Sequence, residues 1–224
     1  MVNIENDFRP QVFEQISRIC KALGHAHRFE ILFLLVNGEH SVEQMSRETG
    51  MSIANTSQHL QNLKRSGLVL SRRAGNTIFY RLADPSILLL LQAARSTAES
   101  RLAEMDRLLN QISTARENCS IINIDSIQES IANEQVLLLD VRPEDEYHNG
   151  HIPNAINIPL ITLEEKLAEL PKNMTYVVVC RDMYSTLSDQ AVRLLQEKGY
   201  QAARLSLGFL EWKAQGKEIV FTAY

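Results

Sequence analysis

Residues 41–82 read SVEQMSRETGMSIANTSQHLQNLKRSGLVLSRRAGNTIFYRL, and this stretch decides the fold of the first half of the chain. Ser41 suits a helix N-cap and Gly50 suits a helix end, so a short helix is predicted at 41–50. A second helix is predicted at 52–67. After residue 67 the spacing of apolar residues is no longer helical. β-branched and aromatic residues on both sides of 74–76 predict a hairpin. Two short helices joined by a tight turn and followed by a hairpin indicate a winged helix-turn-helix.

Helical patterns flank this stretch on both sides. Two helices are predicted before it, at 13–24 and 28–38, from apolar residues at helical spacing. After it, Asp84 and Pro85 suit the N-cap and N1 positions of a helix that continues for more than thirty residues. Apolar residues in this last helix are spaced 4, 3, 4, 3, which indicates a seam: Ala98, Leu102, Met105, Leu109 and Ile112. The helix could pack on its own domain, but its length favours a seam between two chains.

The second predicted helix of the helix-turn-helix would enter the major groove of DNA. Polar residues near its start would face base edges: Ser52, Asn55, Thr56, Gln58 and His59. Arg72, Arg73 and Asn76 on the hairpin would contact phosphates or the minor groove. Residues 49–83 contain no acid and five cations, which is typical of a phosphate-binding face. The alternative is a helical domain whose short helices only pack and whose basic surface is merely solvated.

The second half alternates strands and helices. Apolar strands are predicted at 136–140, 175–180 and 203–207, with helices at 164–170 and 186–199, which indicates an α/β fold with a parallel sheet. A composition shift near 117–124 places the domain boundary there, giving domains at 1–118 and 119–224. The first domain has 14 Lys+Arg against 12 Asp+Glu, and the second has 9 against 15, so the negative charge lies in the second.

The chain has three cysteines, which are far apart and odd in number, so no disulfide framework or zinc spacing is visible. No signal peptide or spanning segment is evident, which predicts a cytoplasmic protein with no membrane partner. Cys20 is expected to be a small buried thiol. Cys119 is expected in a surface linker, where the bolder hypothesis is that it receives sulfur from Cys180 or pairs with it.

Cys180 ends a predicted strand, at the edge where α/β sheets place their ligands. The next residue is Arg181, and the loop amides of 181–186 could curl around the sulfur, with hydroxyls from Ser185 and Thr186. Positive charge and amide donors lower a thiol's pKa, so the pattern predicts a reactive thiolate. The alternative is a buried core cysteine. Asp140 and Arg142 follow another strand, where they could line the same site or belong to a solvated loop.

The first half resembles the ArsR/SmtB family of winged-helix repressors across residues 17–82. The Ser-x-x-x-x-Ser-x-His-Leu pattern at 52–60 and the Leu-x-x-x-Gly-Leu-Val pattern at 63–69 carry this resemblance. It implies a homodimer that binds double-stranded operator DNA and represses its own operon. Metal-sensing members have Cys-x-Cys where this chain reads Ser41-Val42-Glu43. No other ligand cluster replaces it, so no metal site is expected.

The second half resembles single-domain rhodaneses over about residues 123–220. Asp-x-Arg at 140–142, the segment EYHNGHIPNA at 146–155, and Gly208 with Trp212 carry the resemblance. It implies that Cys180 accepts sulfane sulfur as a persulfide from a small donor such as thiosulfate, with no cofactor. In this interpretation Asp140 and Arg142 pair internally and shape the site.

The active-site loop departs from the pattern of rhodanese domains fused to ArsR-type domains, which often read Cys-Arg-Gly-Pro-Tyr-Cys. Here the loop is Cys180-Arg181-Asp182-Met183-Tyr184-Ser185. Ser185 excludes a disulfide within the loop, and Asp182 brings an anion close to the sulfur. Thr186 stands where the Cys-x5-Arg phosphatase loop needs arginine, which excludes that chemistry.

The fusion predicts a transcriptional regulator in which sulfur loading of Cys180 is the sensing event. Two alternatives stay open. One is a sulfurtransferase whose DNA-binding domain autoregulates its gene, and the other is an idle rhodanese module that binds a ligand or a protein.

Overall fold

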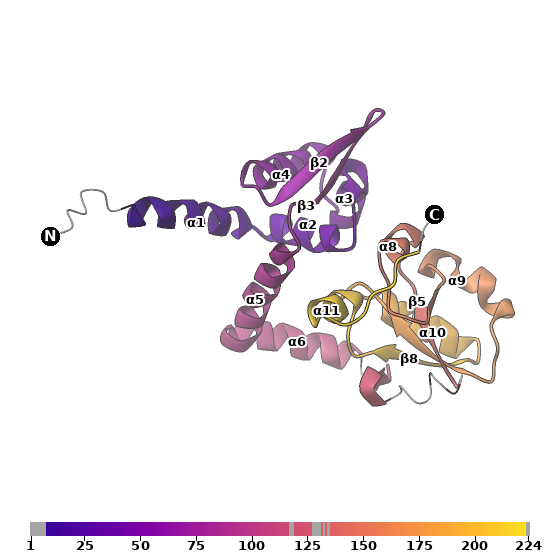
Figure 1. Ribbon diagram of the computed structural model, residues 1–224. Coiled ribbons are helices and arrows are strands. Elements are labelled where there is room, and N and C mark those ends of the chain that lie inside the picture. Colours follow the sequence, from indigo (N-terminus) through magenta and orange to yellow (C-terminus); the bar gives the residue numbers. More distant parts are fainter. Residues whose placement is uncertain (1–7, 117–118, 127–130, 132, 134, 223–224) are drawn as a thin grey trace. The chain divides into compact units, whose positions relative to one another are not determined.

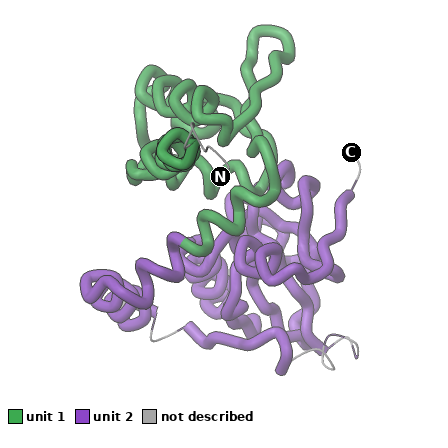
Figure 2. Tube along the Cα trace, turned by 60° about the vertical axis from the view of Figure 1, so that its left-hand side comes forward, with its two compact units in different colours: residues 1–93 green, residues 94–224 purple. Residues whose placement is uncertain are grey.

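A computed structural model describes residues 8–116, 119–126, 131, 133 and 135–222. The chain divides into two compact units, residues 1–93 and 94–224 (Figure 2). The division falls within a helix, twenty-five residues before the boundary predicted from composition at 118/119, and that boundary stays a prediction. No helix in the described part of the chain is both long enough and apolar enough to cross a membrane.

The first unit is a winged helix-turn-helix, as predicted (Figure 1). Its helices are α1 (Arg9–Leu23), α2 (Ala26–Val36), α3 (Val42–Thr49) and α4 (Ile53–Arg65). An antiparallel sheet of order β1-β3-β2 forms the wing from β1 (His40–Ser41), β2 (Val69–Ala74) and β3 (Thr77–Leu82). Side chains from α2, α3 and α4 fill its core, where Ile31, Leu32, Met45, Leu60 and Leu63 are fully buried.

Local sequence explains the ends of these elements. Ser41 and Gln44 form a reciprocal capping box at the start of α3, and Gly50 ends that helix in the left-handed region at φ 68°. The Ser52 hydroxyl accepts a hydrogen bond from the Asn55 amide and caps α4. The hairpin turns at Gly75 and Asn76, with Gly75 at φ 60°.

The long helix predicted after Asp84 is helical but is divided in two. α5 (Ser86–Arg101) and α6 (Ala103–Ala115) meet at Leu102, whose φ of −104° and ψ of 110° are extended. No proline or glycine stands between residues 86 and 115, so the sequence contains no usual signal for a break. The prediction of one uninterrupted helix with a straight seam is therefore wrong at Leu102.

The second unit is an α/β fold around a parallel sheet of order β4-β8-β7-β5-β6 (Figure 1). Its strands are β4 (Ile121–Ile122), β5 (Val136–Asp140), β6 (Ala155–Asn157), β7 (Thr175–Val179) and β8 (Gln201–Leu205). β5 matches its predicted range, and β8 begins two residues earlier than predicted. β4 and β6 were not predicted, because two or three residues are too few to show a period.

Helices cover both faces of this sheet. α9 (Leu160–Lys166) and α10 (Leu187–Glu197) lie over the core that contains Leu139, Tyr176 and Val178. α11 (Phe209–Ala214) packs Phe209 and Trp212 against the opposite core, with Val177 and Val179. The short helix α8 (Glu144–His148) follows β5. β7 is the central strand of the sheet, so Cys180, which follows it, lies at the edge of the sheet between the cores on its two faces.

Candidate functional site: the Cys180 loop and the recognition helix

Cys180 lies directly after central strand β7, at its carboxyl end, as the sequence predicts. Its side chain is almost fully buried, with 1% of its surface exposed. The sulfur donates a hydrogen bond of 3.2 Å to the Asp182 carbonyl oxygen, two residues along the loop. The loop then leads into α10. The thiol therefore sits beneath its own loop instead of opening to solvent.

Two of the loop amides that were expected to surround the sulfur bind the Asp182 side chain. The Tyr184 and Ser185 amides each donate to Asp182 Oδ1 at 2.8 Å. Consecutive amides of this kind form a nest that suits an anion. Here the anion is the chain's own carboxylate, so the prediction that the loop amides face the sulfur is wrong for Tyr184 and Ser185.

The electrostatics of the site favour the neutral thiol. Burial raises the pKa of Cys180 to about 11, with smaller contributions in the same direction from the Asp182 and Glu211 carboxylates. The Ser188 hydroxyl and the Arg204 guanidinium lower the pKa, but by less. Arg181, which was expected to lower it, instead binds Glu146 with both carboxylate oxygens within 2.9 Å of its Nε. At neutral pH the Cys180 sulfur therefore carries its proton.

The end of α5 holds the loop from one side. The Arg95 guanidinium lies 4.9 Å from the centre of the Tyr184 ring, contacts the Met183 sulfur and pairs with Glu211. The Glu99 carboxylate accepts hydrogen bonds from the Tyr184 hydroxyl and, at 2.9 Å, from Arg95. Burial would raise the pKa of Glu99, but these two donors outweigh it and lower the pKa. The Glu99 carboxylate is thus ionised at neutral pH, as its ion pair with Arg95 requires.

Arg116, just beyond α6, holds the same loop through its backbone. It donates to the carbonyl oxygens of Met183 at 2.8 Å, Tyr184 at 3.2 Å and Ser185 at 3.0 Å. Its Nε also binds the buried Asp189 carboxylate at 2.8 Å. We call Arg95, Glu99 and Arg116 the latch residues.

A buried ion pair supports the opposite side of the site. Asp140 and Arg142 are both fully buried and are joined by several hydrogen bonds between 2.6 and 3.1 Å. Arg142 also donates to the Gly150 carbonyl oxygen and lies 4.0 Å from the centre of the Phe209 ring. The predicted internal pairing of these two residues is present, and it fixes the start of α11 to β5.

The first turn of α11 binds the loop closely at Gly208. The Phe209 and Leu210 amides donate to the Cys180 and Arg181 carbonyl oxygens at 2.8 Å. A β-carbon on Gly208 would come within 2.5 Å of the Asp182 nitrogen and 2.6 Å of its carbonyl carbon. Because these are backbone atoms, no side-chain rotation can relieve the overlap.

Gly208→Ala should lower the free energy of unfolding of the second unit by about 1–3 kcal/mol, since the Asp182 backbone must move. Trp212 is the chain's single tryptophan and is 9% exposed in this unit, so its fluorescence during urea unfolding measures the change. An unchanged transition in Gly208→Ala would mean that the loop has room to shift at no cost.

Sequence reasoning missed the residues that hold the loop from elsewhere in the unit: Arg95, Glu99, Arg116, Arg204 and Glu211. Arg95 and Glu99 stand four residues apart in a helix, a spacing that predicts only an ordinary surface pair. Nothing in the sequence indicates that they reach a loop some ninety residues away. Thr186, predicted to add a hydroxyl near the sulfur, is exposed.

On the recognition helix α4, the predicted DNA-binding residues fall into two groups. Asn55 and Gln58 are exposed, as is the capping Ser52. Thr56 is fully buried, with its hydroxyl donating to the Ser52 carbonyl oxygen at 3.0 Å, which corrects its assignment to the groove. His59 is 8% exposed. On the wing, Arg72, Arg73 and Asn76 are exposed, and Arg72 pairs with Glu39 at 2.5 Å.

The two remaining cysteines do not lie as predicted. Cys20 is exposed on α1 instead of buried. Cys119 is 8% exposed and belongs to the core of the second unit with Leu139 and Leu195, so it is not a surface thiol. Burial raises the pKa of Cys119 as well. A relay of sulfur to Cys119 would require this core to open.

Comparisons with known proteins match each half separately and the two halves together. Residues 26–71 match the arsR family of bacterial regulatory proteins, and residues 123–215 match the rhodanese-like domain. The chain is 36% identical over 212 residues to the HTH-type transcriptional regulator Rv0324 of Mycobacterium tuberculosis, covering 95% of this chain and 93% of that protein. A sulfurtransferase of Allochromatium vinosum is 33% identical over 44% of this chain and 92% of its own length. A solved winged helix-turn-helix domain from Mycobacterium bovis, described as homodimeric, is 35% identical with a TM-score of 0.42, covering 44% of this chain and 92% of that one.

Proposed function

The chain belongs to the ArsR family of bacterial transcriptional regulators and carries a rhodanese-like domain, and from this we propose that sulfur loading of Cys180 controls its affinity for operator DNA. One observation carries the proposal. The loop after Cys180 is held by Arg95 and Glu99, which lie on a helix that begins in the DNA-binding unit. A change in the loop therefore acts directly on that helix.

The chemical step is a transfer of sulfane sulfur. The Cys180 thiol releases its proton to solvent, and the thiolate attacks the outer sulfur of the donor. A new S–S bond forms at Cys180, the donor's own S–S bond breaks, and the leaving group departs with the electron pair. That group is sulfite from thiosulfate, or a thiolate from an organic persulfide. The product is a Cys180 persulfide, and no separate oxidant is needed.

The site favours a donor of low charge. The Asp182 carboxylate occupies the amide nest where a sulfonate group would otherwise bind, 2.8 Å from the Tyr184 and Ser185 amides. A dianion such as thiosulfate meets this carboxylate and loses the nest as its binding site. An organic persulfide needs no such site, so it suits Cys180 better.

Loading is expected to disturb the loop, because the Cys180 thiol is 1% exposed and the added sulfur would press against the loop that covers it. A disulfide-type bond places the second sulfur about 2 Å from the first. The persulfide is also more acidic than the thiol, so it competes with Asp182 for the loop amides. Displacing Asp182 shifts Tyr184 and Met183, and through them Arg95 and Glu99 on α5.

The regulator would act as a homodimer on double-stranded DNA. Apolar side chains are exposed by 53–60% of their surfaces at Phe8, just before α1, and at Val12, Phe13 and Ile16 on α1. On α5, Leu89 is 61% exposed. Of the predicted seam, Leu102 is 57% exposed at the break, and none of its five residues is buried within one chain. A second copy covering such apolar side chains would set two recognition helices about 34 Å apart, one turn of DNA.

The test measures sulfur loading and DNA binding on the same full-length sample. Reduced protein is treated with thiosulfate or an organic persulfide, its intact mass is recorded, and its affinity for the DNA upstream of its own gene is measured. In a Cys20→Ser background, which removes the exposed thiol, we expect one added sulfur that is lost when Cys180→Ser is added. We also expect a fall in DNA affinity of about tenfold, within the range of coupling between sites.

Glu99→Gln should still accept sulfur but should lose most of the change in DNA affinity, because its contact with Tyr184 is weakened. Arg107→Gln, which removes a surface ion pair with Glu104 on α6, is the control and should behave as the unmodified chain. Loading with no change in DNA affinity would instead indicate a sulfurtransferase whose first domain only autoregulates. A third function is an idle module that binds a ligand or a protein, and the Asp182 carboxylate in the amide nest favours it. If neither thiosulfate nor the organic persulfide adds sulfur to Cys180, this third function is supported.

A further inference from the structure

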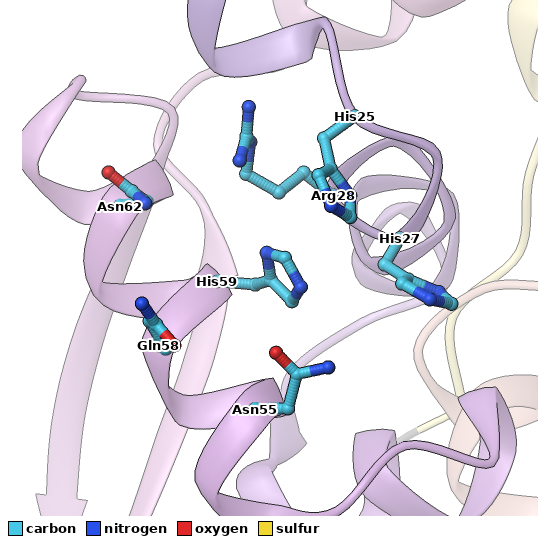
Figure 3. A pocket seen from close by; sticks show the side chains of 7 residues that line it. All are labelled: His25, His27, Arg28, Asn55, Gln58, His59 and Asn62. Carbon is cyan, nitrogen blue, oxygen red and sulfur yellow. The ribbon is translucent and has the colours of Figure 1, made fainter.

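The DNA-binding unit contains a pocket of about 480 Å³ between the start of α2 and the recognition helix α4. Its walls come from two segments. The start of α2 contributes His25, His27 and Arg28, and α4 contributes Asn55, Gln58, His59 and Asn62. In Figure 3 the ring of His59 points from α4 toward the two histidines and the arginine. The pocket is independent of Cys180 and lies in the other unit.

The lining suits an oxyanion. It consists of three imidazoles, one guanidinium and three amides, with no carboxylate among them. The imidazole centroids lie 4.5–5.9 Å apart. Charged groups beyond the lining are Glu30, whose carboxylate is 3.5 Å from His27 Nδ1, and Lys21 at the end of α1. Within the described residues, no group of three or more His, Cys, Asp or Glu is placed to hold a metal ion.

His59 provides a second and independent observation. It is 8% exposed, and its Nδ1 is buried with no hydrogen-bond partner among the residues that the structure describes. A buried polar nitrogen without a partner destabilises the fold, so a ligand that bonds to it would remove that cost. Burial, together with His25, Arg28 and His27, lowers the pKa of His59. A negatively charged ligand would relieve this crowding of positive charge and could accept a hydrogen bond from the ring.

We propose that this pocket binds an oxyanion of the phosphate class, held by His25, His27 and His59 with the charge of Arg28 behind them. Arg28 is fixed in place, because its side chain donates to the carbonyl oxygens of Ala22 and Lys21 at the end of α1. Two sources can supply the same chemistry. One is a backbone phosphodiester of DNA on α4, and the other is a free phosphate-like anion.

The first arm of the test uses inorganic phosphate. The histidine ring resonances of the full-length protein are followed by NMR during a phosphate titration near pH 6. We expect saturable shifts in His25, His27 and His59, and a binding constant weakened at least severalfold in His25→Gln. Arg18→Gln, an exposed cation on α1, is the matched control for loss of charge and should titrate as the unmodified chain. Both substitutions lie at exposed positions, and a thermal melt verifies the fold.

The second arm uses a duplex of random sequence and measures how binding depends on salt. If the pocket holds a backbone phosphate, His25→Gln should reduce the slope of log affinity against log salt by about 1. An unchanged slope together with saturable phosphate binding keeps the site and assigns it to a free anion. Phosphate-induced shifts that do not saturate, or that survive unchanged in both His25→Gln and His27→Gln, would overturn the proposal.

Discussion

Asp182→Ala should speed the alkylation of Cys180 near pH 8 by about 10- to 100-fold. The substitution removes the carboxylate that occupies the Tyr184 and Ser185 amides, and it also removes a negative charge that raises the pKa of the thiol. Freed amides can turn to the sulfur and stabilise its anion. The pKa of Cys180 is about 11, so near pH 8 only about one thiol in a thousand is ionised. Lowering the pKa of Cys180 by about one to two multiplies the ionised fraction, and with it the alkylation rate, by about 10 to 100.

The rate is measured by intact mass during treatment with iodoacetamide, across a range of pH. Cys20→Ser serves as the background for every variant, because Cys20 is exposed and would react first. Asp182→Asn separates the two effects, since an amide oxygen still accepts from both loop amides but carries no charge. We expect the alkylation rate of Asp182→Asn to lie between the rates of the parent and of Asp182→Ala. Equal rates for Asp182→Ala and the parent would mean that the amides stay away from the sulfur and that burial alone sets its reactivity.

Arg142→Met should lower the free energy of unfolding of the second unit by about 3–5 kcal/mol, because it leaves the fully buried Asp140 carboxylate without its cation. The lost hydrogen bond to the Gly150 carbonyl oxygen and the lost contact with Phe209 act in the same direction. Urea unfolding followed by Trp212 fluorescence measures the loss in this unit, with the first unit contributing no tryptophan signal.

The double variant Asp140→Leu with Arg142→Met tests the cause. Replacing both members of a buried pair with apolar residues of similar size is often close to neutral, so most of the stability should return. The double variant should also load Cys180 with sulfur if the pair acts only through the fold. A double variant as unstable as Arg142→Met would show that the hydrogen bond to Gly150 and the packing on Phe209 matter more than the charge pair.

Local sequence predicted the fold well where capping and periodicity decide it. Ser41 caps its helix, Gly50 ends that helix, and the hairpin turns at Gly75, all as predicted, and the two halves have the predicted classes. The short strands β4 and β6 were missed, because their hydrogen bonds depend on neighbours far along the chain. The extended conformation of Leu102 was missed for a similar reason, since nothing in residues 86–115 disfavours a continuous helix.

The candidate site could be predicted only in part. Its position followed from a cysteine at the end of a strand, and the pairing of Asp140 with Arg142 followed from the family resemblance. The protonation state of the Cys180 thiol could not be predicted, because the sequence pattern does not tell whether the loop amides bind the sulfur or a nearby carboxylate. The sequence did indicate that Asp182 would bring an unfavourable negative charge close to the Cys180 sulfur. Hydrogen bonds of 2.8 Å from two amides explain how the loop accommodates it.

The position of the latch residues has a practical consequence for anyone who isolates the rhodanese-like half. A fragment that starts at residue 119, as the composition of the chain invites, would lack Arg95, Glu99 and Arg116. Its loop would lose the three carbonyl contacts of Arg116 and the partners of Tyr184, and Asp189 would lose the nearer of its two arginines. Sulfur transfer measured on such a fragment would describe an unrestrained loop, and a fragment that starts before residue 94 would be needed to preserve the one in the whole protein.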